Sequence, residues 1–411
     1  MQITKDVCRA WDAEDPLAAC RDRFDLPDGV IYLDGNSLGA LPRTTAARLQ
    51  DVIRQEWGRD LIKSWTSAGW MALPAQVGGR IARLIGARPH EVTAADSTSV
   101  NYYKLAEAAL ALRPDRRVVV SEAGDFPTDA YILQGLVAAS GGRLELKLVA
   151  REDIAAAVAP DVALLALSHV HYKTGVLHDM AGLTAAAHAA GAVCLWDLSH
   201  SAGALDLDLN AADVDLAVGC GYKYLNGGPG APGFMFVADR LQTQIRSPIT
   251  GWIGHAEPFA FADAYVSAPD VRRMLSGTPA VLGLQALNEG LKTFDGVAMA
   301  DVRAKSMRLT QLFLDLARHR LDGLGFVPAC PGEPQARGSQ ISLRHPKAQQ
   351  VMTDLIAAGV IGDFRPPDLL RFGMTPLYTR YVDIWDAVDQ IARIAQRLSY
   401  KELKQRRRPR M

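Results

Sequence analysis

Short apolar runs alternate with alanine- and leucine-rich segments of helical period from about Val92 to Phe236. The candidate strands are residues 116–122, 162–170, 191–200 and 214–220, and the candidate helices are residues 102–112, 129–140 and 179–191. Strands that are apolar throughout and separated by helices are typical of a parallel sheet covered on both faces. We therefore predict an α/β fold with a doubly wound, mostly parallel sheet.

A second pattern of helices and strands occupies the last third of the chain. Apolar positions recur at helical period in residues 280–294, 301–321 and 383–398, with mixed patterns between them. We predict a large domain over residues 51–280, a smaller α+β domain over residues 281–411, and an N-terminal segment, residues 1–50, that joins the small domain. The basic run at residues 401–411 is predicted to be a solvated end rather than a nucleic-acid arm.

Composition and charge favour a small-molecule enzyme. The 411 residues are 49% hydrophobic, and 45 Lys and Arg balance 45 Asp and Glu, so no global field attracts nucleic acid or an anionic membrane. The five cysteines form no CxxC pair, which indicates reduced thiols. The first residues carry early charges and no apolar signal-peptide core, so we expect a cytoplasmic enzyme.

Polar residues follow three of the predicted strands directly. Ser168 and His169 end one run, Asp197 and His200 end the next, and Tyr222 and Lys223 end the third. In open α/β sheets ligands bind outside the carboxyl ends of the strands. We therefore expect these side chains to lie close together at one edge of the sheet.

Two further segments suggest a cofactor. Thr98 and Ser99 follow the candidate caps Asp96 and Ser97 at the mouth of a predicted helix, where free N–H groups and the helix dipole favour a phosphate; an ordinary N-cap is the alternative. Phe126, held extended by the following proline, either fills the core or stacks on a flat ring.

Together these groups match the needs of pyridoxal 5'-phosphate. Lys223 supplies the Schiff-base amine, and the Asp197 carboxylate keeps the pyridine nitrogen protonated so that the ring accepts electrons. Phe126 supplies an aromatic plate, and the phosphate cradle consists of Thr98, Ser99 and Tyr222.

A zinc site is the rival interpretation of the same region. His169 and His171 are spaced to share one strand face, and His178 and Asp179 follow. A lysine lies beside them and no third ligand has a motif spacing, so we predict no metal.

Seven motifs in order resemble the kynureninase family: "LDGNSLGALP", "FPTD", "HVHYKTG", "WDLSHSAGA", "GYKYLNGGPG", "GWIGH" and "RFGMTPLY". The resemblance runs from about Ile31 to Arg397. It implies a fold-type I pyridoxal-phosphate enzyme of the aspartate aminotransferase superfamily. It also implies hydrolysis of L-kynurenine to anthranilate and L-alanine, in tryptophan catabolism or NAD biosynthesis, by a homodimer with shared active sites.

The resemblance also implies roles for individual residues. Lys223, Tyr222 and Asp197 would be catalytic. The other cofactor contacts would come from Thr98, Ser99, Phe126, Asp129, Ser168, His200, Trp252 and Thr278. The substrate contacts would come from Ser37, Trp65, Gly277 and Arg371, with the Arg371 guanidinium suited to a bidentate hold on the substrate carboxylate.

Two positions bear on substrate choice. Family members that prefer the 3-hydroxylated substrate carry smaller or polar groups where this chain has Trp65, and an Asn where it has Thr278. The resemblance therefore implies a bacterial type that prefers kynurenine itself, because an added hydroxyl would be crowded and unpaired. Ser199, where alanine is usual, and Ser99, where threonine is frequent, are minor departures.

Two alternative functions remain. A cysteine desulfurase or selenocysteine lyase needs a mobile nucleophilic cysteine, and the late Cys330 has no evident activating neighbour. A non-catalytic binding protein of the same fold would not need Lys223, Asp197 and Arg371 together.

Overall fold

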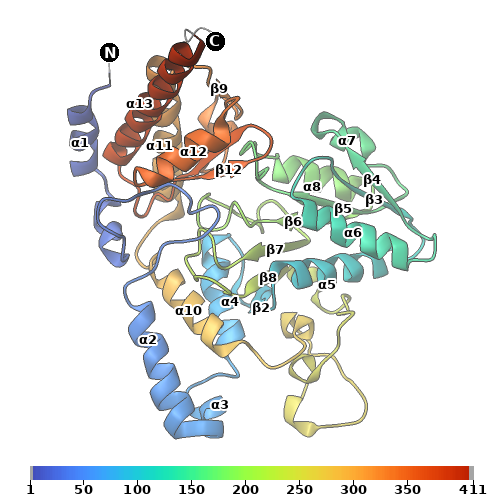
Figure 1. Ribbon diagram of the computed structural model, residues 1–411. Coiled ribbons are helices and arrows are strands. Elements are labelled where there is room, and N and C mark those ends of the chain that lie inside the picture. The colour runs from blue at the N-terminus through green and yellow to red at the C-terminus, as the bar shows by residue number, and fades with distance from the viewer. Residues whose placement is uncertain (1–2, 407–411) are drawn as a thin grey trace.

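The computed structural model describes residues 3–406 and places the predicted strands in one seven-stranded sheet. The sheet order is β2 (Val92–Ala95), β8 (Gly233–Val237), β7 (Leu216–Cys220), β6 (Val193–Asp197), β5 (Val162–Ser168), β3 (Val118–Glu122) and β4 (Glu145–Val149). Strand β8 runs antiparallel to both of its neighbours, and the other pairs are parallel. The predicted doubly wound, mostly parallel sheet is therefore confirmed (Figure 1).

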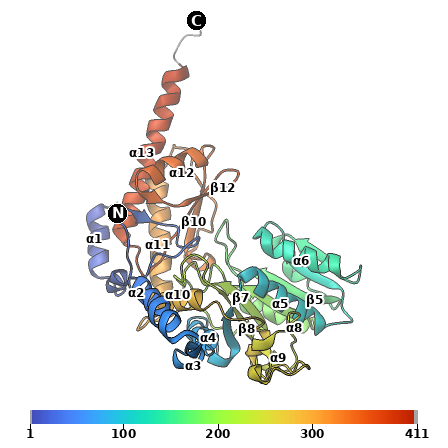
Figure 2. The ribbon, with the colours of Figure 1, turned by 60° about the horizontal axis from the view of Figure 1, so that its bottom comes forward.

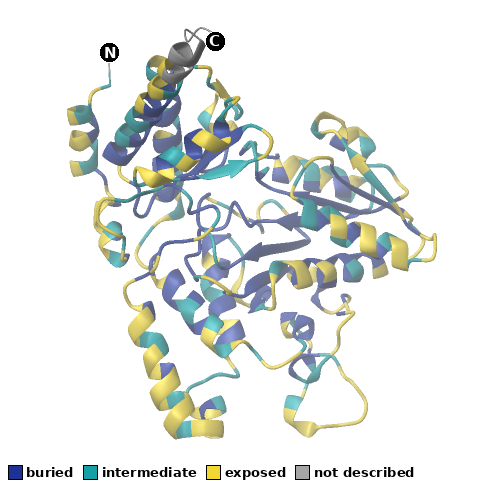
Figure 3. Ribbon diagram, viewed as in Figure 1, coloured by how far each residue is buried: buried dark blue, intermediate teal, exposed yellow. Residues whose placement is uncertain are grey.

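Helices cover both faces of this sheet because its strands are apolar on both sides. In β6, Cys194 and Trp196 pack into one core cluster, whereas Val193 and Leu195 pack into another. The first cluster is completed by α4 (Leu73–Leu84), α8 (Met180–Ala189) and α10 (Val281–Lys292), and the second by α5 (Thr98–Ala111) and α6 (Pro127–Ala139). Figure 3 shows the sheet in dark blue between helices that are yellow on their outer sides. The shorter α7 (Ile154–Ala157) and α9 (Asp239–Gln242) lie at the periphery.

The small domain has its own sheet and core. Strands β12 (Asp363–Arg365), β13 (Leu369–Gly373), β10 (Gln340–Arg344) and β9 (Val327–Pro328) form an antiparallel sheet in that order. Helices α11 (Met299–Arg320), α12 (Ala348–Ala357) and α13 (Tyr381–Arg406) complete the domain, and in Figure 2 α13 extends beyond the rest of it. The side chains of the predicted basic tail, residues 401–411, lie outside those described.

The N-terminal segment packs on the small domain. Strand β1 (Ile31–Tyr32) pairs with β11 (Val360–Ile361), and α1 (Lys5–Ala13) lies along α13 (Figure 1). Helix α10 instead contributes Leu284 and Leu287 to the large core, so the packing favours a boundary after α10 rather than before it. The domain limits themselves stay a prediction. Within residues 3–406 no helix is long and apolar enough to cross a membrane.

A separate helical arm leaves the large domain. It consists of α2 (Thr45–Asp51), the π-helix η2 (Val52–Asp60), the 3₁₀ helix η3 (Leu61–Lys63), and α3 (Ser64–Ser67). The arm exposes large apolar side chains: Trp57 is 59% exposed and Ile62 is 76% exposed. Single exposed apolar residues are ordinary, but a cluster of them indicates a contact surface.

Candidate active site

A cleft lies at the carboxyl ends of β5, β6 and β7, where the sequence predicted it. These strands are neighbours in the sheet, and Ser168 stands opposite Asp197 in their register. Nine predicted site residues line the cleft: Thr98, Ser99, Phe126, Asp129, Ser168, Asp197, His200, Tyr222 and Lys223. Four others that the sequence did not single out for the site also line it: Thr128, Val170, Tyr172 and Ser199.

Lys223 enters the cleft from the loop after β7. Its ammonium nitrogen is 3.1 Å from His200 Nε2 and lies 5.9 Å from the Phe126 ring centroid. The N-terminal segment holds this loop in place, because the Gly39 N–H donates a hydrogen bond to the Tyr222 carbonyl. A side chain at Gly39 would have its Cβ only 2.4 Å from the Lys223 carbonyl oxygen, so only glycine permits this approach.

Carboxyl groups gather beside the lysine. Asp197 is buried, and one of its oxygens accepts a 2.7 Å hydrogen bond from the Ser199 N–H. Burial, together with the charges of Asp197 and Asp125, raises the pKa of Asp129 well above its usual range. Burial also raises the pKa of Asp125. The raised pKa favours the protonated form of Asp129, which can donate a hydrogen bond to Asp197.

The N-terminus of α5 forms the other end of the cleft. Ser97 caps the helix by accepting from the Val100 N–H, as predicted. The hydroxyl of Thr98 is buried with no hydrogen-bond partner among the described residues. Gly233 lies so close that an added Cβ would be 3.0 Å from the Thr98 nitrogen. An unpaired hydroxyl and free backbone N–H groups at a helix N-terminus fit the phosphate of pyridoxal phosphate.

Beneath this helix terminus lies an ion pair between a buried lysine and a partly exposed aspartate, which was not predicted from the sequence. Lys104 is 1% exposed, and its ammonium donates to Asp96 at 2.7 Å and to the Met274 carbonyl at 3.0 Å. Asp96 has a positive φ of 47°, a left-handed conformation that is uncommon outside glycine. The pair therefore holds the turn that presents Thr98. The sequence did offer a signal for this pair, because Lys104 lies among apolar residues on the predicted helix over residues 102–112.

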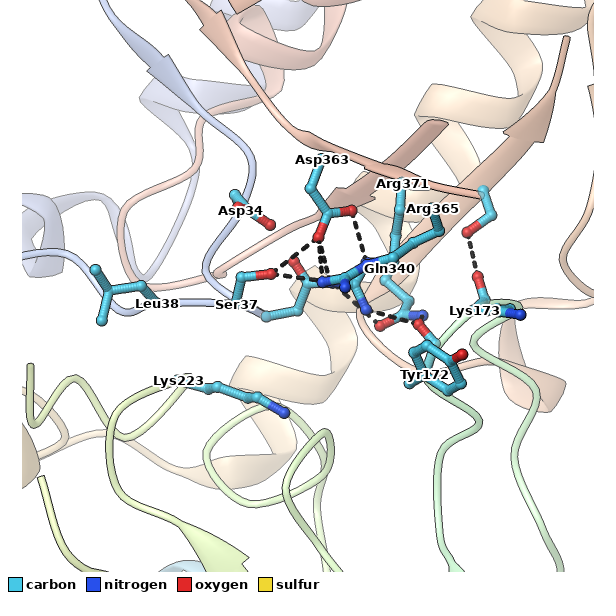
Figure 4. A network of polar contacts seen from close by, with 12 residues as sticks. Asp34, Ser37, Leu38, Tyr172, Lys173, Lys223, Gln340, Asp363, Arg365 and Arg371 are labelled. Atoms are coloured by element: carbon cyan, nitrogen blue, oxygen red, sulfur yellow. Dashed lines mark hydrogen bonds and ion pairs between the residues drawn. The ribbon is translucent and has the colours of Figure 1, made fainter. Parts of the chain in front are cut away.

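Arg371 lies above the lysine in a dense polar network (Figure 4). Its guanidinium donates to both oxygens of Asp363, to Ser37 Oγ at 2.8 Å and to the Tyr172 carbonyl at 2.8 Å. Burial, with Asp363 next, raises the pKa of the neighbouring Asp34 to about 6. The structure thus brings together Ser37 and Arg371, which are 334 positions apart in sequence.

Four predicted contacts lie neither in the lining of the cleft nor in the network around Arg371. Trp65, on α3, packs edge to face with Trp252 at a centroid distance of 6.0 Å. Gly277 and Thr278 are exposed, and Thr278 lines an apolar groove with Trp57 of the helical arm. Within one chain these residues form a surface next to the arm, so their predicted roles remain predictions.

The histidines considered for zinc have other partners. His169 Nδ1 is 2.9 Å from Ser201 Oγ, and His178 Nε2 is 2.7 Å from Glu122. His171 Nε2 is 3.1 Å from the Gly124 carbonyl. In the part of the chain that the structure describes, no group of three or more His, Cys, Asp or Glu side chains is arranged to hold a metal.

The cysteines offer no nucleophile to the cleft. Cys8, Cys20, Cys194 and Cys220 are buried, and burial raises the pKa of each of these thiols. Burial also raises the pKa of Cys330, which lines a different hollow beside α11. These thiols are poor candidates for desulfurase chemistry, which requires a thiolate.

Comparison with known proteins identifies the family. The model for the kynureninase C-terminal domain matches residues 302–391. Curated kynureninases from Burkholderia mallei and Deinococcus radiodurans are 48% and 49% identical to this chain over 94% and 95% of its length, and the alignments cover 94% and 96% of those relatives. The chain belongs to the kynureninase family.

Solved structures place this kynureninase-family chain in the fold of pyridoxal-phosphate enzymes. A cysteine desulfurase from Thermococcus onnurineus NA1 has a TM-score of 0.78 at 17% identity, over 92% of this chain and 98% of that one. The C-DES protein, in a structure with glycine covalently linked to pyridoxal phosphate, has a TM-score of 0.79 at 16% identity, over 90% and 98%. At these identities the likeness concerns the fold alone.

Proposed function

We propose that this chain hydrolyses L-kynurenine to anthranilate and L-alanine with pyridoxal phosphate. The observation that carries the proposal is the identity of 48% to a curated kynureninase over 94% of the chain. The cleft supports it, because an amine, a buried carboxylate, an aromatic ring and an unpaired hydroxyl at a helix N-terminus line the same space.

We infer the cofactor contacts from the positions of these groups. The N-terminus of α5, with Thr98 and Ser99, would hold the phosphate, and Phe126 would cover one face of the ring. Asp197 would accept the N–H of the pyridine nitrogen. When bound, pyridoxal phosphate withdraws electrons from the α-carbon of an amino-acid substrate.

The side chains divide the remaining tasks. Lys223 would attach the cofactor and, once released, would take the α-proton on its amine nitrogen. Burial raises the pKa of Tyr222, so its phenol keeps a proton and can donate it at the substrate carbonyl. Arg371 would bind the substrate carboxylate by its terminal N–H groups, with Ser37 beside it.

We also propose that two copies of the chain form a homodimer through the helical arm. The arm and the segment that follows residue 249 expose a shared set of large apolar side chains: Trp57, Leu61, Ile62, Phe259, Phe261, Val266 and Leu282. Trp65, Trp252, Gly277 and Thr278 lie at this surface rather than in their own cleft, so in a dimer they would serve the partner's cleft. The unpaired cysteines suit a cytoplasmic, reducing location.

Two residues of this surface, Trp65 and Thr278, bear on the choice between kynurenine and 3-hydroxykynurenine. Trp65 is bulky, and Thr278 lacks the amide of an asparagine, so a 3-hydroxyl group on the substrate would be crowded and unpaired. We therefore propose that 3-hydroxykynurenine is hydrolysed more weakly than kynurenine.

The activity is tested by following anthranilate fluorescence from kynurenine with the cofactor-loaded protein, and by running 3-hydroxykynurenine in parallel. Turnover of kynurenine, with the hydroxylated substrate weaker, is the expected result. Absence of turnover of either substrate would refute the proposal, and cysteine would then be tested.

The shared site has a separate test. A Lys223→Ala variant and a Trp252→Ala, Thr278→Ala double variant, each impaired alone, should recover activity when subunits are exchanged, because one cleft of the mixed dimer is then intact. A scattering mass equal to the single chain of 44.4 kDa, or mixtures with no recovery, would contradict the dimer.

A further inference from the structure

A buried hydrogen-bond chain connects the small domain to the cleft lysine. Gln340, the first residue of β10, is 1% exposed, and its side chain lies between His200 and the turn that follows β5. Gln340 Oε1 is 3.1 Å from His200 Nδ1, and His200 Nε2 is 3.1 Å from Lys223 Nζ. The three residues therefore form a continuous path from small domain to amine.

The orientation of the Gln340 amide is fixed by its other contacts. Its Nε2 donates to the Tyr172 carbonyl at 2.9 Å and to the His171 carbonyl at 3.4 Å. A carbonyl oxygen can only accept, so the NH₂ group must face these two oxygens, and the Oε1 atom must face the histidine. Gly175, with a positive φ of 70°, makes room for this side chain, because an added Cβ would be 2.9 Å from Gln340 Cγ.

The orientation of the amide in turn decides the histidine tautomer. Gln340 Oε1 is an acceptor, so His200 Nδ1 must carry the hydrogen. Burial, and next the charges of Lys223 and Arg371, lower the pKa of His200 well below its usual range, and Arg365 acts in the same direction. A neutral imidazole with its hydrogen on Nδ1 has a bare Nε2, which is the atom that faces Lys223.

We propose that Gln340 is a positioning residue that fixes His200 as the Nδ1–H tautomer, so that its bare Nε2 accepts a hydrogen bond from the released Lys223 amine. An amine that donates one N–H to a fixed acceptor has its lone pair oriented, and a general base must be oriented to take a proton. This inference rests on the proposed role of Lys223 as base.

The same path reaches the group proposed to bind the substrate carboxylate. The Tyr172 carbonyl accepts from Gln340 Nε2 and also from Arg371 Nη1 at 2.8 Å (Figure 4). One turn of the chain, next to β5, thus holds both the carboxylate-binding guanidinium and the residue that sets the tautomer. The orientation of the proposed base and the binding site for the substrate carboxylate are therefore fixed by the same turn.

The tautomer can be measured without relying on turnover. Holoenzyme labelled with ¹⁵N-histidine would be studied by solid-state nitrogen spectroscopy, and a His200→Gln variant would assign the signal. The wild type should show a protonated Nδ1 and a bare Nε2 on His200. Gln340→Met, which has a similar length and no amide, should give mixed tautomers. Gln349→Met, the same change at an exposed position on α12, should leave the spectrum unchanged.

Kinetics supply the second readout. In Gln340→Met, kcat should fall by about 10- to 100-fold, which is a part of the roughly 10²- to 10⁴-fold that a general base contributes, while KM changes much less. Gln340→Glu keeps an oxygen acceptor for the His200 Nδ1–H, and it provides a second variant if Gln340→Met does not fold. Its negative charge should raise the pKa of His200, favour the imidazolium, and add an ionisation to the kcat–pH profile.

The outcomes separate this inference from the proposed function. A wild-type His200 with its hydrogen on Nε2, or a Gln340→Met variant that keeps both the tautomer and kcat, would overturn the positioning role. A Gln340→Glu variant with wild-type spectrum and pH profile would do the same. If the tautomers behave as expected but the wild type does not hydrolyse kynurenine, the proposed function fails and the geometric inference stands.

Discussion

The ion pair beneath the α5 terminus, with one buried and one partly exposed member, predicts an unequal response to removal of the two residues. The Lys104 side chain is 1% exposed, whereas the Asp96 side chain is 34% exposed. Asp96→Asn leaves a fully buried ammonium without its anion. Losing one partner of a fully buried pair costs about 3–5 kcal/mol, so this is the upper bound for a pair whose aspartate is partly exposed. Asparagine tolerates the left-handed conformation, so backbone strain adds little.

Lys104→Met should be milder. The methionine fills a similar space, and the remaining carboxylate is partly in water, so the main loss is the hydrogen bond to the Met274 carbonyl. An unpaired buried carbonyl costs about 1–3 kcal/mol. The double variant should be more stable than Asp96→Asn alone, because it no longer buries a lone charge. The coupling between the two changes should therefore exceed the cost of Lys104→Met alone, about 1–3 kcal/mol.

Urea unfolding of the wild type, both single variants and the double variant gives the four free energies of unfolding. The dissociation constant of pyridoxal phosphate, measured on the same proteins, should rise in Asp96→Asn because the turn that presents Thr98 loosens. The reasoning is refuted if Lys104→Met is the more destabilising change. It is also refuted if the two effects add within about 0.5 kcal/mol.

Three further predictions concern the cleft and its network. Lys223→Ala should abolish steady-state release of anthranilate, and substantial activity would exclude Lys223 as the base. Arg371→Lys should raise KM for kynurenine by about 10- to 100-fold, because a lysine cannot replace a bidentate guanidinium; an unchanged KM would move the carboxylate site elsewhere. Because the pKa of Asp34 is raised to about 6, the folded chain keeps a proton there that the unfolded chain loses from about pH 4. The contribution of Asp34 to the free energy of unfolding should therefore fall as pH rises from about 4 to about 6, by no more than about 3 kcal/mol. Urea unfolding at a series of pH values measures this slope, and Asp34→Asn should remove it. Equal slopes in the wild type and the variant would show that Asp34 is not the group responsible.

The local pattern of the sequence determined the elements and much of the cleft. The apolar runs in the sequence located β5, β6 and β7. The polar residues that follow these strands, among them Asp197 and Lys223, line one cleft. This succeeded because parallel strands bring their carboxyl ends to one edge, so position along a strand already implies position in space.

The tertiary structure alone decided the contacts between distant segments. The strand order, the antiparallel β8 and the pairing of Ser37 with Arg371 depend on how whole elements pack. Gln340 and His200 are 140 positions apart, and no periodicity connects them. Local pattern encodes which face of an element is buried, whereas the partner of a buried polar group is set only when distant elements close on one another and each donor must find an acceptor.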